Sequence, residues 1–406
     1  MIHAGVIGIL LFSTAVYLRG DYPRWAYYLA FTIKALATIA IGEYFLTYEQ
    51  SGDTILYFSE AVQFNQEYAD SFSIYIQALI SADIPALATN WHSVFFVKLI
   101  APFVWFTGAN YWTTALYLTL VNFILTWTAV TLLVQHYHRK WLIYIAFFAI
   151  PSTLAWSGGV FKESVSNGCL FLLIATAVHQ LDQPHFSGFR QKDWLSLIGI
   201  ILCWVILLKI RFYLAGLIVV FVVIAGWLQW FKGSGWVRWS TLFALLIICF
   251  FSMQLFHPYL RPERLPLTFY ENYQQIHQAT GADRAITYSS LNPTYSGLLL
   301  SIPVAALTGL FRPMILEFWD WIYFPFQLEK LAMLVLLIWS LRSIKLVKPS
   351  SVGWTGIALV ILLATALAIV SPNFGSLLRY QSAYTPFLFI IVAFLPLKLI
   401  DSTSNQ

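Results

Sequence analysis

Residues 212–231 read FYLAGLIVVFVVIAGWLQWF, a continuous apolar run without a single charged side chain. A helix of about 20 residues crosses the roughly 30 Å hydrocarbon core of a bilayer. Inside that core every backbone N–H and C=O group needs a partner within the chain, which an α-helix supplies. The run therefore predicts a transmembrane helix, and runs of the same kind lie on both sides of it.

The composition of the whole chain supports the same class. Of its 406 residues, 59% are hydrophobic and only 10% are charged. A water-soluble protein needs far more charge to cover its surface. The net charge of +5 comes from basic residues scattered at the ends of apolar runs, which argues against nucleic-acid binding. The chain is thus predicted to be a polytopic helical membrane protein.

Apolar runs of about 16 to 25 residues predict an all-α bundle of about eleven spans in a single integral membrane domain, 1–406. The runs lie near 3–18, 26–47, 109–134, 141–156, 164–181, 194–208, 212–231, 239–256, 327–341, 351–370 and 383–400. Two longer segments, 48–108 and 257–326, fall between these runs. Each holds an apolar stretch that is too short to span, so we expect interfacial or re-entrant helices there.

Basic residues in the short loops predict the orientation, because Lys and Arg accumulate on the cytoplasmic side of a membrane. Alternate loops carry Arg19 and Arg24, Arg139 and Lys140, Arg190 and Lys192, Lys232 and Arg238, and Arg342, Lys345 and Lys348. This pattern places the N-terminus and the two longer segments outside, and the C-terminus, after Lys398, in the cytoplasm.

The first outer segment contains the most chemically informative stretch, SGDTILYFSEA from Ser51 to Ala61. A carboxylate, aromatic residues and a second carboxylate at the outer edge of a bundle can carry out acid–base chemistry. Asp53 is the first candidate for a proton acceptor and Glu60 is the second. A structural alternative exists for Asp53, because an aspartate that follows glycine is typical of a helix N-cap.

Further charged residues fall on the same predicted outer side. They are Lys162, Glu163, Lys209, Arg211, Arg312, Glu317, Asp320 and Arg379. Charges at the hydrocarbon edge are costly unless they face water or a partner, and Lys and Arg suit an anionic lipid headgroup such as a polyprenyl phosphate. Simpler alternatives are a local ion pair for Lys162 with Glu163, an ordinary loop for Lys209 with Arg211, and an interface anchor for Arg379 with Tyr380.

The remaining polar and sulfur-containing residues show no recognisable site. The cysteines Cys169, Cys203 and Cys249 lie inside apolar runs without metal or redox spacing, so we expect buried core residues. The histidines His136, His138, His179 and His185 show no metal-binding spacing. Lys34 lies within the second run, where it either snorkels or pairs with Glu43.

Three stretches together resemble the membrane-embedded (GT-C type) glycosyltransferases that use polyprenyl-phosphate sugars, especially uncharacterised bacterial members. The first is GDTILYFSEA, with Asp53, Tyr57 and Ala61 at the positions of the acidic outer-loop motif. The second is PSTLAWSGGVFKES, in which Lys162 and Glu163 form the Lys–acid dipeptide. The third is LLRYQSAYTPFLFI, with Arg379, Tyr380 and Pro386 before a late span, and LFRPMILE adds a weaker match.

The resemblance implies transfer of a hexosyl or pentosyl group from the lipid phosphate to an acceptor on the outer face of the bacterial cytoplasmic membrane, in cell-envelope polysaccharide or glycan assembly. It implies a base role for Asp53, with Glu60 second. It implies a phosphate site that consists of Arg379, Lys209, Arg211 and Lys162, with Tyr57, Glu163, Arg312 and Tyr380 as further substrate contacts. The partners implied are the lipid-linked sugar, a glycan, lipid or protein acceptor, and membrane lipids.

The chain also departs from that family's pattern. Two runs precede the acidic segment where the family usually has one, and the segment shows a single Asp instead of paired acids. Dependence on a divalent metal therefore stays open. Two other functions remain: an O-antigen-type polysaccharide polymerase, and a non-enzymatic transporter or flippase of lipid-linked glycans. A transporter requires charges near the membrane midplane, where only Lys34 is expected.

Overall fold

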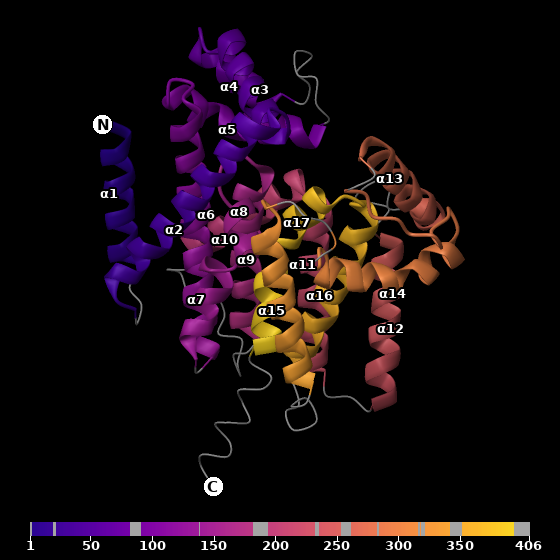
Figure 1. Ribbon diagram of the computed structural model, residues 1–406. Coiled ribbons are helices and arrows are strands. Elements are labelled where there is room, and N and C mark those ends of the chain that lie inside the picture. Colours follow the sequence, from indigo (N-terminus) through magenta and orange to yellow (C-terminus); the bar gives the residue numbers. More distant parts are fainter. Residues whose placement is uncertain are drawn as a thin grey trace. The chain divides into compact units, whose positions relative to one another are not determined.

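The computed structural model describes residues 2–18, 22–81, 91–137, 139–181, 194–231, 235–252, 261–281, 284–315, 317, 321–341 and 351–393. All regular elements in these ranges are helices, apart from one isolated bridge between Ala285 and Asn373 (Figure 1). The prediction of an all-α protein is therefore confirmed. Among the loop residues used for the orientation, Arg19, Arg190, Lys192, Lys232, Arg342, Lys345, Lys348 and Lys398 lie outside the described ranges.

The chain divides into two compact units. The N-terminal unit consists of Met1–Ala149, Thr153–His179 and His185–Gly216, and the C-terminal unit of Ile150–Ser152, Gln180–Pro184 and Leu217–Gln406. The helices of the N-terminal unit are α1 (Ile2–Tyr17), α2 (Arg24–Glu43), the π-helical η1 (Tyr44–Glu49), α3 (Asp53–Tyr68), α4 (Phe72–Ile80), α5 (Trp91–Phe106), α6 (Tyr111–Leu133), the short η2 (Val134–His136), α7 (Lys140–Phe148), α9 (Lys162–Leu181) and α10 (Trp194–Ile210). The boundary between the units falls within α8 (Pro151–Trp156) and α11 (Phe212–Trp230).

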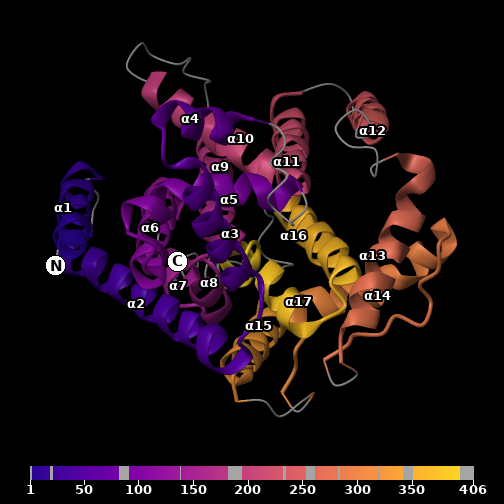
Figure 2. The same ribbon diagram turned by 90° about the horizontal axis from the view of Figure 1, so that it is seen from above.

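The C-terminal unit contains the remaining helices. They are α12 (Gly235–Ser252), the short η6 (Pro262–Arg264), α13 (Leu265–Ala279), α14 (Tyr295–Phe311), α15 (Phe324–Leu341), α16 (Ser351–Val370) and α17 (Phe374–Gln381). A further helical stretch covers residues 385–393, and the rest of the predicted last span, 394–400, lies outside the described residues. In this unit α14 packs along α16, and both contact α17 (Figure 2).

Six helices of the described chain are long and apolar enough to cross a membrane: Arg24–Glu49, Tyr111–His136, Lys162–Leu181, Phe212–Trp230, Phe324–Leu341 and Val352–Val370. Four shorter apolar helices accompany them: Ile2–Tyr17, Ser93–Phe106, Ser196–Ile210 and Tyr295–Phe311. The protein is therefore a helical membrane protein, while the count of about eleven spans stays a prediction. The expected short helices in the two longer segments correspond to α5 and α14, which both contain an internal proline.

The predicted continuous span 141–156 is wrong. The structure breaks it into α7, which ends at Phe148, and α8, which begins at Pro151. Proline has no N–H to continue the hydrogen bonding of a preceding helix, yet it fits the first position of a new one. The apolar run is therefore interrupted between these two helices before it reaches α9.

A buried polar contact fixes the turn between α8 and α9. The side chain of Lys34 on α2 is fully buried and donates to Ser157 Oγ. Nearby, Thr38 Oγ1 lies 2.9 Å from Thr119 Oγ1, which accepts from Gly159 N at 3.1 Å. The predicted pairing of Lys34 with Glu43 is wrong, because nine residues of helix separate them by about 13 Å along its axis. Glu43 is exposed and accepts from Thr47 Oγ1.

Candidate functional site

The stretch that begins at Ser51 forms a sharp turn into α3. Gly52 occupies the N-cap position with φ of +112°, a backbone conformation that favours glycine. Asp53 is the first residue of the helix, and the N-cap residue Gly52 has no side chain with which to cap it. The alternative role of Asp53 as an N-cap is therefore wrong. Its Oδ2 accepts instead from the hydroxyl of Tyr57, one helical turn later, at 3.1 Å.

One face of α3 carries the predicted site residues. Tyr57, Glu60 and Phe64 are buried on this face, which the spacing of three and four residues explains. The face packs against α5, where the ring of Tyr57 meets that of Phe96 edge-to-face at 5.3 Å. Glu60 is therefore held inside the packed side of α3, one turn beyond Tyr57, whereas Asp53 is half-buried at the end of the helix.

The start of α9 lies beside Tyr57. The ammonium group of Lys162 lies over the ring of Tyr57, 5.1 Å from its centroid, and donates to Ser93 Oγ on α5 at 2.8 Å. A cation over an aromatic face is attracted to it, and the serine hydroxyl supplies a second fixed contact. The structure thus brings together Asp53, Tyr57 and Lys162, which lie more than a hundred residues apart in the sequence at their widest. We refer to these three residues as the acid–base cluster.

Glu163, the neighbour of Lys162, forms a buried ion pair with Arg211, the residue between α10 and α11. The side chains are only 2% and 8% exposed, so the contact compensates two charges that are held away from water. Arg211 is therefore no ordinary loop residue. Lys209, two residues earlier, is exposed, and it is the cation of this turn that faces outward from the packed unit.

The other predicted site residues belong to the C-terminal unit. Arg312 follows α14, pairs with Glu317 and lies over the ring of Phe374, 5.0 Å from its centroid. Arg379 and Tyr380 are half-buried on α17. Their helix is fixed by Gln381, whose Nε2 donates to Gly309 O at 2.9 Å and to Arg312 O at 2.8 Å. A single site that joins these residues with the acid–base cluster stays a prediction.

Tyr288 is a loop residue before α14, and its surroundings change the pKa of its hydroxyl. Burial raises the pKa of Tyr288 to about 12, although the positive charge of Arg312 acts in the opposite direction. Its hydroxyl therefore stays protonated at neutral pH and donates to Ala368 O at 3.0 Å. This contact ties the loop to α16 beside the Arg312 turn.

Four buried charges of the described chain, Lys34, Lys98, Glu329 and Lys330, were not among the predicted site residues, and two of them pair with each other. Glu329 and Lys330 on α15 form an ion pair at 2.7 Å, and the same carboxylate accepts from the backbone N and hydroxyl of Ser152 at 2.7 and 2.9 Å. Their signal is visible in the sequence, because the dipeptide interrupts the apolar run FPFQLEKLAMLVLLIWSL. Ser93, by contrast, gives no sequence signal, since its role comes only from the packing of α5 beside α9.

Metal and thiol chemistry find little support in the described part of the chain. It contains no group of three or more His, Cys, Asp or Glu side chains that could hold a metal ion. His136 and His179 form one close pair, with Nε2 and Nδ1 3.1 Å apart. His138 and His185 lie outside the described residues.

Cys169 and Cys203 are buried free thiols, which confirms the prediction for these two. The side chain of Cys249 lies outside the described part.

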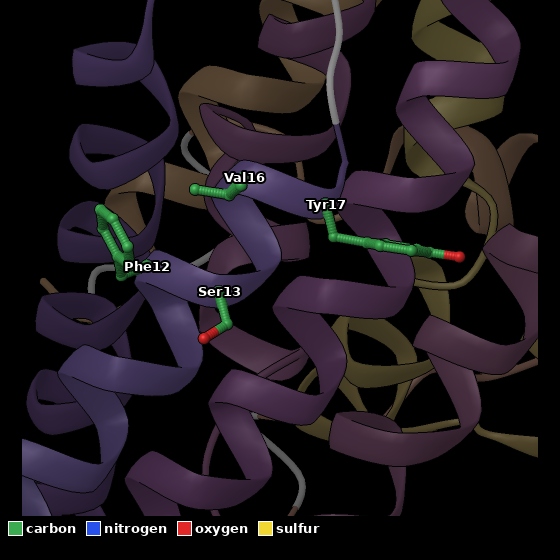
Figure 3. Close-up of a pocket in the computed structure, with 4 residues that line it drawn as sticks. All are labelled: Phe12, Ser13, Val16 and Tyr17. Atoms are coloured by element: carbon green, nitrogen blue, oxygen red, sulfur yellow. The ribbon is translucent and has the colours of Figure 1, made fainter.

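An open pocket lies elsewhere in the N-terminal unit. It is lined by Phe12, Ser13, Val16 and Tyr17, all from α1 (Figure 3). None of these side chains carries a charge at neutral pH, and the pocket contains none of the predicted site residues. The acid–base cluster therefore remains the candidate functional site.

Comparisons with protein-family models, with curated proteins and with solved structures find no match for this chain.

Proposed function

We propose that the protein transfers a sugar from a polyprenyl-phosphate donor to an acceptor hydroxyl at the outer face of the bacterial cytoplasmic membrane, in the assembly of cell-envelope glycans. The observation that carries this proposal is the acid–base cluster at the start of a candidate membrane span. It combines a carboxylate, a phenol and an ammonium group at the N-terminal end of α9, where a lipid headgroup would lie.

The cluster supplies what this reaction needs. The acceptor hydroxyl attacks the anomeric carbon, its proton passes to the carboxylate of Asp53, and the bond between the sugar and the lipid phosphate breaks. The phosphate leaves with the bonding electron pair, and the ammonium of Lys162 stabilises the negative charge that develops on it. Tyr57, which contacts both groups, fixes their positions. Glu60 is the second candidate for the base.

The ion pair of Glu163 and Arg211 changes which basic residues we expect to bind the phosphate. A guanidinium that already compensates a buried carboxylate is less available to a phosphate than the ammonium of Lys209, which is exposed, or that of Lys162, which is half-buried. The phosphate site of the N-terminal unit therefore consists chiefly of Lys162 and Lys209, with Arg211 as the residue that holds Glu163. Arg312, Arg379 and Tyr380 are proposed as further donor contacts from the C-terminal unit.

A second function, transport of a lipid-linked glycan, is favoured by one observation. Lys34, Glu329 and Lys330 are buried within candidate membrane spans, and charged groups there commonly mark the path of a substrate or an ion. The contacts of Glu329 also have a structural explanation, because its carboxylate satisfies the N–H of Ser152 in the first turn of α8.

One assay separates these functions. The full chain in lipid nanodiscs is incubated with a panel of radiolabelled undecaprenyl-phosphate hexoses and pentoses, together with a mixture of cell-envelope glycans as acceptors. Transfer predicts release of undecaprenyl phosphate and movement of the label to a water-soluble or lipid-linked acceptor. In proteoliposomes, movement of an intact labelled donor between leaflets without release of undecaprenyl phosphate would support transport and contradict the transferase proposal.

A further inference from the structure

Three aromatic side chains pack around the turn that leads into α9. Phe45 comes from the π-helical η1, Trp156 ends α8, and Phe161 directly precedes α9. All three pairs meet edge-to-face, with ring centroids 6.0 Å apart for Phe45 and Trp156, 5.5 Å for Phe45 and Phe161, and 5.6 Å for Trp156 and Phe161. We refer to them as the aromatic triad. A π-helical turn such as η1 is rare and is frequent at functional sites.

The aromatic triad lies against the acid–base cluster at two points. A Cβ atom placed on Gly52, the residue before Asp53, would lie 3.2 Å from the ring of Phe45. Phe161 is covalently joined to Lys162, whose ammonium lies over Tyr57. The aromatic triad is therefore joined to the acid–base cluster at two places. These are Gly52, the neighbour of Asp53, and Phe161, the neighbour of Lys162. All of these residues belong to the N-terminal unit.

One polar atom of the aromatic triad lacks a partner. Trp156 is only 8% exposed, and its Nε1–H has no hydrogen-bond partner among the described residues. Buried polar groups are nearly always hydrogen-bonded, and the Nε1–H of Trp156 is one of several exceptions among the described residues, distinguished by its place beside the acid–base cluster. The neighbouring phenyl rings of Phe45 and Phe161 carry no acceptor oxygen. An acceptor brought by a ligand would satisfy the N–H.

We propose that the aromatic triad binds the sugar of the lipid-linked donor, with the Nε1–H of Trp156 donating to a sugar hydroxyl. This inference rests on the proposed function and names the part of the donor that the site recognises. A sugar ring presents apolar C–H groups together with hydroxyl acceptors, which matches apolar walls with one fixed donor. A polyprenyl chain offers no acceptor for the N–H. The phosphate, as an anion, belongs beside the ammonium of Lys162.

The test compares two probes on the full chain in nanodiscs. Native mass spectrometry measures binding of undecaprenyl phosphate alone and of the undecaprenyl-phosphate sugars of the panel. Wild-type protein should bind the best sugar-bearing lipid more tightly than the bare lipid. Trp156→Phe keeps an apolar ring and removes the N–H, so it should weaken sugar-lipid binding about tenfold, the scale of one hydrogen bond, and leave binding of the bare lipid unchanged.

Trp127→Phe is the matched control. The Nε1–H of Trp127 is likewise buried without a hydrogen-bond partner among the described residues, but Trp127 belongs to a separate aromatic cluster of the same unit, with Tyr22, Tyr27 and Phe123. Its replacement removes an equivalent N–H and should change binding of neither lipid. If Trp156→Phe does not fold, Phe161→Leu takes its place, because it removes a ring of the aromatic triad and keeps an apolar side chain. The expected result is the same selective loss of sugar-lipid binding.

Three results would overturn the inference. Unchanged binding of both lipids by Trp156→Phe would mean that the indole N–H contacts no substrate. An equal loss for both lipids would assign the aromatic triad to the lipid chain or the phosphate, while the proposed function would stand. Failure of wild-type protein to bind either lipid would overturn the inference together with the proposed function.

Discussion

At the scale of single residues, the buried pair of Glu163 and Arg211 is expected to affect stability. Its two charges lie between helices that meet only in the folded protein, α9 and the turn between α10 and α11. The sequence shows each residue at the end of an apolar run but does not show that they meet. Removal of one partner deprives the other buried charge of this ion pair, whereas removal of both removes the two charges together.

A double-mutant cycle tests this role. Glu163→Gln and Arg211→Met should each lower the free energy of unfolding by about 3–5 kcal/mol, and the double variant should lose much less than the sum. Thermal unfolding in detergent measures all three variants. Lys209→Met, at the exposed neighbouring cation, should stay within about 0.5 kcal/mol of wild type. Additive losses in the double variant would show that the two side chains do not stabilise each other.

For single residues, the sequence predicts a candidate base at Asp53, and this role stays a prediction. The stretch SGDTILYFSEA indicated acid–base chemistry at Asp53, and the structure adds that Tyr57 donates to this carboxylate. The N-cap role was wrong because Gly52 occupies that position. The contact of Lys162 with Ser93 could not be predicted, since it depends on a packing of α5 and α9 that no local pattern encodes.

At the scale of helices, α14 and α16 of the C-terminal unit approach each other closely. A Cβ atom added at Gly309 would overlap the carbonyl group of Ala364 on the facing helix. Small residues at such a crossing allow two backbones to approach, which is how many membrane helices associate. The carbonyl of Gly309 also accepts from Gln381 and from the hydroxyl of Tyr384, so the crossing holds the end of α14 beside α17.

Two glycine-to-alanine variants in this pair of helices should act in opposite directions. Gly309→Ala should destabilise the protein by about 1–3 kcal/mol, because the new methyl group collides with backbone that cannot rotate away. Gly356→Ala, on α16 with nothing within 4 Å of the added carbon, should stabilise it by about 0.5–1 kcal/mol through lower backbone entropy in the unfolded chain. Thermal unfolding in detergent distinguishes them, and equal effects of the two variants would refute the close crossing.

At the scale of the whole molecule, hydrophobicity and length predicted the helical membrane class and most helix positions. The same two signals gave a wrong prediction at 141–156, because the apolar run is continuous in the sequence while the helix is interrupted before Pro151. They also gave no indication that contacts divide the chain into two units, since such a division depends on long-range packing. The orientation rests on loop charges alone and needs its own experiment.

Labelling of single cysteines on intact cells tests that orientation, in a variant from which the three native cysteines have been removed. Cysteines at Ser51 and Lys209, both exposed, should react with a membrane-impermeant maleimide. Cysteines at positions 188 and 233 should react only after the membrane is opened. The candidate span Phe212–Trp230 separates Lys209 from position 233. Reaction of these two positions from the same side would therefore contradict the predicted topology.

The most direct test of the account is sugar transfer by Asp53→Asn. The amide keeps the size of the side chain and can still accept from Tyr57, but it no longer takes up a proton, so transfer should fall by about a hundredfold or more. Binding of undecaprenyl phosphate and thermal stability should stay at the wild-type level. Asp70→Asn, at the exposed carboxylate just beyond α3, is the matched control and should transfer normally. Transfer by Asp53→Asn at the rate of the wild type and the control would contradict the role of Asp53 as the base.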